Sequence, residues 1–248
     1  MQANDARKFA ADVLEDKVAA RLRAAGASEG SLRAATRAML HASMVGVDSH
    51  GVRLTEHYCT MLAGGRLNKT PQLAVQQRGA GSAMVDGDDG LGHFAAYKAV
   101  EVGIELARVA GVGAVGINHS SHLGAAGAYA LAGAEQGFVT FATTNTDSMV
   151  TLFDGAARFH GTNPLAFAAP VPGSRPWLVD MATSSIPMNR VLLNRSLGLE
   201  LPAGVAADKD GSATTDPHLA DMLLPLGGAD YGYKGAALAG VATLFSAL

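Results

Sequence analysis

Apolar residues recur at helical spacing through the first third of the chain. A helix is predicted over residues 5–25, because apolar side chains return there every three or four positions, and Gly26 stands where the helix would end. The same spacing predicts a second helix over residues 31–46. A third is expected to begin at Asp48 or Ser49, since either side chain can cap a helix N-terminus. The opening third is therefore predicted to be helical.

Beyond Pro71, short apolar runs alternate with longer amphipathic segments, which is typical of an α/β fold. Residues 112–117 are interpreted as a buried strand, and residues 235–248 as a helix so apolar that it must be buried. The change of pattern predicts a helical domain over residues 1–75 and an α/β domain over residues 76–248. Other strands are predicted over residues 80–86, 138–143, 165–169 and 178–181, and other helices over residues 93–108 and 123–136.

Composition narrows the class of protein. The 248 residues are 48% hydrophobic and carry 19 basic against 22 acidic side chains, a balance that suggests no nucleic-acid partner. Cys59 is the only cysteine, so no internal disulfide can form. The N-terminus lacks a secretory signal pattern, and the longest uncharged stretch, residues 109–134, contains polar residues that a membrane would not tolerate. A cytoplasmic protein without a membrane span is expected.

One glycine-rich segment matches a nucleotide-binding motif in its letters but not in its context. Residues 111–116 read Gly-Val-Gly-Ala-Val-Gly, the pattern G-x-G-x-x-G. That fingerprint works when a strand precedes the glycines and a helix N-terminus follows them to face a pyrophosphate. Here the glycines occupy the entrance and body of a predicted strand, so the Rossmann interpretation is rejected.

Two segments contain residue types that can bind a metal ion. The acidic turn at residues 86–90 lacks the glycine and glutamate that an EF-hand loop requires. His119 and His122 have no third ligand nearby in the sequence. No metal site is predicted.

A short polar run, Asp48 to Arg53, is the first candidate for chemistry. On a helix beginning near Ser49, His50 and Arg53 would share a face, where a carboxylate could dock beside a neutral imidazole. The alternative is a histidine in a capping region beside a surface arginine. Sequence physics alone leaves both interpretations open.

Other polar clusters lie where predicted strands end. Residues 118–127 crowd asparagine, serine and two histidines between apolar elements, which usually requires more than a packing role. Asp147 follows another strand, where a carboxylate can orient a histidine. Lys234 lies in a predicted glycine-bounded turn before the last helix, from which it can reach a phosphate or simply be solvated.

Five segments taken in order resemble the malate/L-lactate/L-sulfolactate dehydrogenase-like family, which is distinct from the Rossmann-type lactate and malate dehydrogenases. The resemblance implies a non-Rossmann NAD(P)-binding α/β domain with a separate N-terminal helical domain, usually as a homodimer. It also implies a longer chain, because the family continues beyond the position of Leu248 to complete the fold and cofactor cleft. The five segments are residues 46–51, 118–127, 161–167, 180–184 and 232–235.

The resemblance also assigns site residues. The family's proton-transferring histidines match His50 and His122, and different members use one or the other. A histidine-orienting carboxylate matches Asp147. Many relatives have a Gly-Lys pair where this chain has Asn189 and Arg190, so the choice between NAD and NADP stays open. Positions implied to contact the cofactor are His122, Thr146, Asp180, Met181, Ala182, Thr183 and Lys234.

Three functions are compatible with these residues. The leading hypothesis is an NAD(P)-dependent oxidoreductase acting on a small 2-hydroxy or 2-keto acid, with Arg53 holding the substrate carboxylate and a histidine exchanging the hydroxyl proton. The alternative enzyme is a cyclic ketimine reductase that would use the same carboxylate clamp. The alternative of a different class is a non-catalytic nucleotide-binding or assembly protein.

Overall fold

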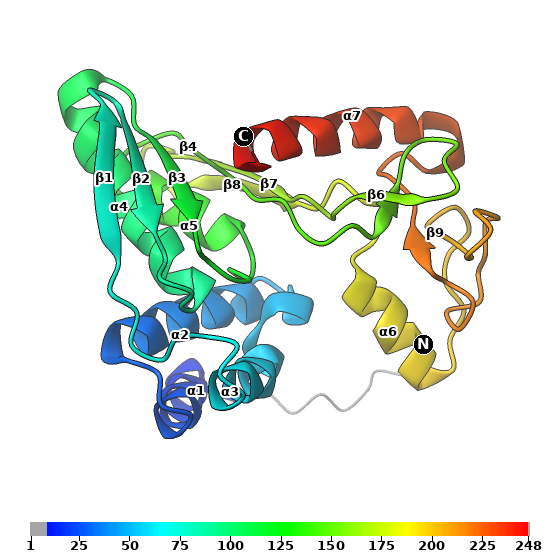
Figure 1. Ribbon diagram of the computed structural model, residues 1–248, viewed down its shortest axis with the longest axis horizontal. Coiled ribbons are helices and arrows are strands. Elements are labelled where there is room, and N and C mark those ends of the chain that lie inside the picture. Colours follow the sequence, from blue (N-terminus) through cyan, green and yellow to red (C-terminus); the bar gives the residue numbers. More distant parts are fainter. Residues whose placement is uncertain (1–8, 248) are drawn as a thin grey trace. The chain divides into compact units, whose positions relative to one another are not determined.

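The computed structural model describes residues 9–247 as a mixed α/β protein. Its contacts divide the chain into two compact units, Met1–Gly133 and Ala134–Leu248, each of which is described by itself. Helices α1 (Ala11–Ala24), α2 (Glu29–Met44) and α3 (Thr55–Ala63) belong to the first unit together with a small sheet (Figure 1). A separate helical domain over residues 1–75 therefore stays a proposal.

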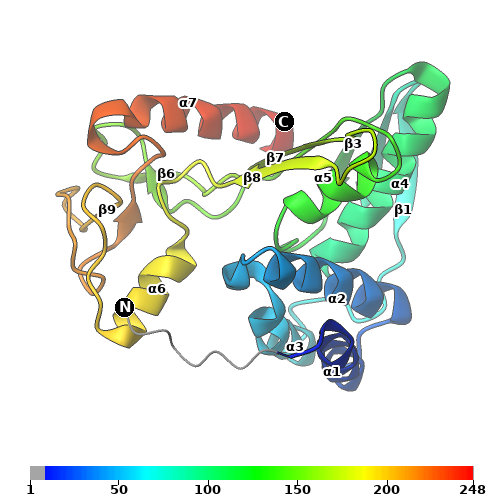
Figure 2. The same cartoon turned by 180° about the vertical axis from the view of Figure 1, so that it is seen from behind.

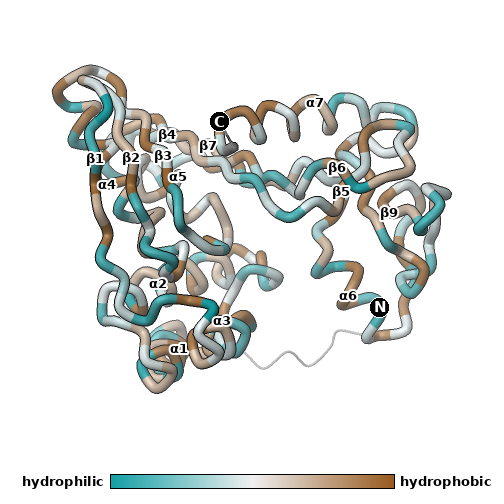
Figure 3. The backbone as a smooth tube through the Cα atoms, viewed as in Figure 1, coloured by the Kyte–Doolittle hydropathy of each residue, from teal (hydrophilic) through white to brown (hydrophobic). Residues whose placement is uncertain are grey.

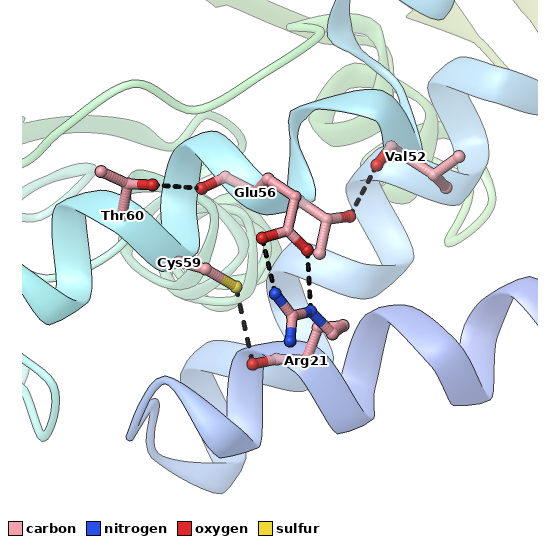
Figure 4. Close-up of polar contacts among 6 residues, drawn as sticks. Arg21, Val52, Glu56, Cys59 and Thr60 are labelled. Carbon is pink, nitrogen blue, oxygen red and sulfur yellow. Dashed lines mark hydrogen bonds and ion pairs between the residues drawn. The ribbon is translucent and has the colours of Figure 1, made fainter.

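The first three helices pack around one apolar core. Leu22, Met39 and Leu62 are fully buried there, one from each helix, as their spacing predicts. At the surface of this bundle, Arg21 of α1 makes a two-pronged ion pair with Glu56 of α3 at 2.7 and 2.6 Å (Figure 4). Both side chains are exposed, so the buried apolar contacts contribute most of the stability.

The predicted third helix is wrong over its first turns. Two short 3-10 helices, η1 (Asp48–His50) and η2 (Val52–Leu54), lie where it was expected to begin, and α3 starts only afterwards. Gly51 interrupts them in an extended conformation, φ −89° and ψ −160°. Ser43 fixes this break, because its Oγ accepts a hydrogen bond from the Val52 N–H at 3.1 Å and leaves no room for a Cβ on Gly51.

The sheet of the first unit runs in the order β1 (Ala74–Gly79), β2 (Ser82–Asp86), β3 (Ala114–Asn118). Strand β1 was not predicted, because its residues are exposed and do not alternate between apolar and polar. Strand β3 pairs with β2 in parallel and is only half-buried, so the expectation of a buried strand is wrong. Helix α4 (Gly92–Ala110) packs against β2 and β3 (Figure 2).

The glycine-rich segment at residues 111–116, which matches the nucleotide-binding motif in its letters only, runs from the end of α4 into β3. Gly111 has φ +81° and caps α4, a left-handed conformation that glycine adopts without strain. Gly113 lies against the backbone of Gly103, and Gly116 pairs with Met84 in the parallel ladder. The order is helix, glycines, strand, the reverse of the dinucleotide fingerprint.

The second unit holds two small sheets. One is antiparallel, in the order β4 (Thr140–Thr143), β7 (Leu165–Ala169), β8 (Trp177–Met181), close to the predicted strands. The other has the order β6, β5, β10, β9. Among the residues described, no helix combines the length and apolar character needed to cross a bilayer. The remaining elements are α5 (Gly127–Ala134), β5 (Val150–Thr151), β6 (Arg158–His160), α6 (Met188–Leu197), β9 (Ala206–Ala207), β10 (Met222–Leu223) and α7 (Gly228–Ala247).

Helix α7 is longer than predicted and is only partly buried by the described residues. It begins at Gly228, seven positions before the predicted start, because no proline or charge run prevents the earlier turns from continuing the helix. Small residues such as Ala239 and Ala242 form its buried face, whereas Leu244 is 61% and Phe245 71% exposed. The described residues therefore leave part of this apolar helix exposed, and its cover by later residues or by a second subunit stays a prediction; Figure 3 shows apolar residues on the tube of α7 near its C-terminal end.

Candidate functional site

Two histidines far apart in the sequence lie together in the first unit. His50, at the end of η1, and His122, in the loop between β3 and α5, have ring centroids 5.6 Å apart. Tyr58 of α3 holds His122, because its hydroxyl oxygen lies 2.7 Å from His122 Nδ1 and its ring stacks on the His122 ring. The structure therefore assembles an imidazole pair from the two polar segments singled out in the sequence.

The surroundings of His122 favour a neutral ring. The pKa of His122 is lowered by desolvation first and then by repulsion from His50 and His57. The residue keeps exposed surface, but its ring lies against Tyr58 and His50, and the loss of water around the ring is the main cause of the lower pKa. At neutral pH the imidazole of His122 is therefore uncharged.

Tyr58 and His93 are residues of this cluster that sequence reasoning missed as site residues. Tyr58 is 1% exposed, and burial raises the pKa of its phenol, which stays protonated. His93, in the first turn of α4, is fully buried against the Tyr58 ring, and burial lowers its pKa to about 3. The available signal was Tyr58 itself, because a tyrosine on the inner face of a helix requires a partner for its hydroxyl.

Two other residues from the same polar segments, His119 and Arg53, are exposed and are not described as part of this cluster. His119 is exposed and pairs with Asp86 at 2.9 Å, which raises the pKa of His119; the pKa of Asp86 is lowered first by the hydrogen bond from the Asp88 N–H and then by His119. Arg53 is exposed on η2, and the extended Gly51 removes the continuous helical face that His50 and Arg53 were expected to share. Ser49 Oγ lies 2.9 Å from His50 Nδ1.

Within residues 9–247, no group of three or more His, Cys, Asp or Glu side chains is placed to hold a metal.

Other candidate residues lie in the second unit, in the loop after β4. Thr146 Oγ1 accepts a hydrogen bond from the Thr162 N–H at 3.0 Å, and the Thr146 N–H donates to Asn163 Oδ1 at 3.1 Å. Asp147 beside it is exposed. Because His50 and His122 belong to the first unit, the pairing of Asp147 with a histidine stays a prediction.

The end of β8 carries a further group. Asp180 and Met181 are exposed, and Ala182 is half-buried after them. Thr183 is fully buried, and its hydroxyl lies within hydrogen-bond distance of the Thr162 and Asn163 carbonyls, at 3.1 and 3.2 Å. The hydroxyl of Thr183 is thus engaged within the protein.

Lys234 lies on α7 and not in the predicted turn. Because α7 begins at Gly228, position 234 lies inside the helix. Its side chain is exposed, and the ammonium lies 5.1 Å from the ring centre of Tyr231 and 5.9 Å from that of Tyr233. An exposed cation beside aromatic rings can meet an anionic group.

Comparisons with known proteins fit this arrangement. The chain is 38% identical over 193 residues to the malate dehydrogenase of Pyrococcus abyssi, covering 77% of this chain and 53% of the relative. It is 34% identical over 221 residues to the NAD(+) ureidoglycolate dehydrogenase of Escherichia coli K12, covering 89% and 63%. The chain therefore spans about half to two thirds of the length of these curated relatives.

A solved structure and a family model agree with the curated relatives. The Δ1-piperideine-2-carboxylate reductase of Pseudomonas syringae superposes with a TM-score of 0.90 at 30% identity, covering 97% of this chain and 72% of that one. The model of the malate/L-lactate dehydrogenase family matches residues 9–248. The chain belongs to the malate/L-lactate dehydrogenase family.

Proposed function

We propose that this chain is an NAD(P)-dependent oxidoreductase that transfers a hydride between the cofactor and a small 2-hydroxy or 2-keto acid. The observation that carries the proposal is the imidazole pair of His50 and His122, with His122 neutral and held by Tyr58. A neutral imidazole is suited to exchange a proton with a substrate hydroxyl.

The proposed proton transfer depends on a neutral histidine ring that can accept a proton. In the oxidation direction, a ring nitrogen of His122 or His50 takes the hydroxyl proton while the hydride leaves the carbinol carbon. Reduction runs the same transfer backwards, so the histidine returns its proton to the new alcohol oxygen. Arg53 is proposed to hold the substrate carboxylate, and Asp147 to orient a histidine.

The second unit offers groups that fit NAD or NADP. Lys234 supplies an exposed ammonium for phosphate, and the exposed Asp180 and Met181 end a strand where hydroxyl and ring contacts are possible. Thr146 and Ala182 would complete the contacts, whereas the buried Thr183 would support this strand end through its bonds to the Thr162 and Asn163 carbonyls. When bound, the cofactor supplies the hydride acceptor or donor.

The proposal also covers the type of cofactor domain, the oligomeric state and the cellular location. The reversed order of helix, glycines and strand at residues 111–116 supports a non-Rossmann cofactor domain. The exposed apolar side chains of α7, Leu244 and Phe245, support a homodimer. We further propose a cytoplasmic location.

Tyr58→Phe is expected to lower turnover about tenfold or more. The change removes the hydroxyl 2.7 Å from His122 Nδ1 but keeps the buried ring, so the core is preserved while the imidazole loses its partner. Steady-state kinetics over a range of pH would measure the effect, with Tyr97→Phe as a control, since the Tyr97 ring meets the Tyr129 ring edge-on. Equal turnover in the Tyr58 variant and the wild type would remove Tyr58 from the mechanism.

Arg53→Lys is expected to raise the KM for the acid substrate and leave cofactor binding unchanged. A guanidinium can bind a carboxylate through two parallel hydrogen bonds, which an ammonium cannot reproduce. Substrate KM and cofactor Kd should be measured on the same preparation. If the KM of every active acid is unaltered, Arg53 is a surface residue without a role in substrate binding.

A cyclic ketimine reductase is the second candidate, and the likeness to the piperideine carboxylate reductase favours it. Its substrate would offer the same carboxylate to Arg53 and take a hydride at the imine carbon. A panel of 2-keto acids and cyclic imine 2-carboxylates, each with NADH and NADPH, separates the two enzymes. A fluorescence titration with the cofactors tests both enzymes against a non-catalytic assembly protein, which need not bind them.

A further inference from the structure

Asn163 uses both ends of its side-chain amide inside the second unit. It is 1% exposed, and its Oδ1 accepts the Thr146 N–H at 3.1 Å. Its Nδ2 donates to the Ala239 carbonyl at 3.1 Å and to Thr243 Oγ1 at 2.9 Å, both on α7. Only an amide supplies an acceptor and two donors from one short side chain.

The backbone of Asn163 engages a third segment. The Thr183 hydroxyl lies 3.2 Å from the Asn163 carbonyl, which ties the end of β8 to the same residue. Asn163 has φ +33°, an uncommon conformation for a residue other than glycine. The neighbouring Gly161 allows this approach, because a Cβ there would lie 2.1 Å from Thr146 Oγ1 and 2.7 Å from Asn163 Oδ1.

We propose that Asn163 is a positioning residue that holds three cofactor-binding segments in one arrangement. These are the loop with Thr146, the strand end with Thr183, and helix α7 with Lys234. The inference rests on the proposed function, which places cofactor contacts on these three segments. It adds that their mutual placement depends on one buried amide.

Asn163→Asp tests the proposal, because it keeps the size and one acceptor but replaces the donor to Ala239 and Thr243 with an oxygen. We expect the Kd for NADH or NADPH to rise about tenfold or more, since the Ala239 carbonyl and Thr243 Oγ1 lose their donor. The KM for the cofactor should rise with it, while the KM for the acid substrate stays unchanged. The matched control is Asn194→Asp, which breaks an exposed amide contact to the Glu200 carbonyl and should leave the Kd unaltered.

Thr243→Val provides a second, milder variant if Asn163→Asp does not fold. It removes one acceptor of the Asn163 amide with little change in volume, and we expect a smaller rise in cofactor Kd of about threefold. Ser246→Ala controls for loss of a hydroxyl on the same helix, where Ser246 donates only to its own helix at Ala242.

The outcomes separate this inference from the proposed function. If the wild-type protein binds neither cofactor, the proposed function fails. If the wild type binds and the folded variants of Asn163 and Thr243 bind equally tightly, the positioning role fails even where their melting temperatures fall. Weaker cofactor binding in these variants but not in the controls supports it.

Discussion

His122→Ala is expected to lower turnover by about a hundredfold or more while the protein stays folded. General acid–base catalysis by a positioned side chain contributes on the order of 10²- to 10⁴-fold, and His122 is a neutral imidazole of the cluster. It lies outside the apolar core of the three N-terminal helices, so its removal should leave that core intact. Steady-state turnover and circular dichroism on the same preparation measure both effects.

His119→Ala is the matched control for this prediction. His119 comes from the same junction after β3, but it is exposed and pairs with Asp86 at the surface. We expect its turnover to equal that of the wild type. If folded His122→Ala keeps near-wild-type turnover, the proton passes elsewhere, and His50→Ala becomes the variant to test.

The state of His122 also sets a pH dependence. Because its pKa lies below the ordinary value, the neutral form that accepts a proton persists as the pH falls below the normal range of histidine. Other titratable groups facing it are His50, His57, Tyr58 and the buried His93. In the oxidation direction, the acid limb of the kcat profile should therefore lie below pH ~6.5, the value of an unperturbed histidine.

Dilution is expected to lower specific activity together with molecular mass. The apolar patch formed by Phe141, Phe167, Leu244 and Phe245 is exposed, and the Phe141 ring contacts both Phe167 and Phe245. Contiguous apolar surface of this kind marks an association site, which we assign to a second copy of the chain. Sedimentation and activity measured over the same concentration range test the link.

Phe245→Glu sharpens this test by placing a charge within the patch. It should shift the mass toward a monomer and reduce activity, whereas Leu219→Glu, at a comparably exposed but separate leucine, should change neither. An active monomer of the wild-type protein in light scattering would contradict the link between assembly and catalysis.

The sequence predicted helices and strands best where the spacing of apolar residues along the element is enough to identify it. Strand β7 was predicted at its observed bounds, and α2 was predicted with its buried face. Both follow from the regular spacing of apolar residues within the element itself. Strand β1 was missed because its residues are all exposed and show no alternation of apolar and polar positions. The break at Gly51 was missed because it depends on Ser43, a contact that local sequence does not reveal.

The candidate site shows the same division. The sequence singled out both polar segments that contain His50 and His122, because polar residues crowded between apolar elements are informative. It did not show that Tyr58 joins them, since a hydrogen bond across 64 positions depends on how α3 packs. Asn163 was likewise visible only as one residue of a resembling segment, because its partners lie on three separate elements.

Hydride transfer to a small acid is the central claim, and the absorbance of reduced nicotinamide tests it most directly. The purified protein should be incubated with NADH or NADPH and each member of a panel of 2-keto acids. We predict that at least one acid causes loss of reduced cofactor, with the matching 2-hydroxy acid as product, and that His122→Ala abolishes most of it. No acid-dependent oxidation of either cofactor, together with no cofactor binding by fluorescence, would contradict the account.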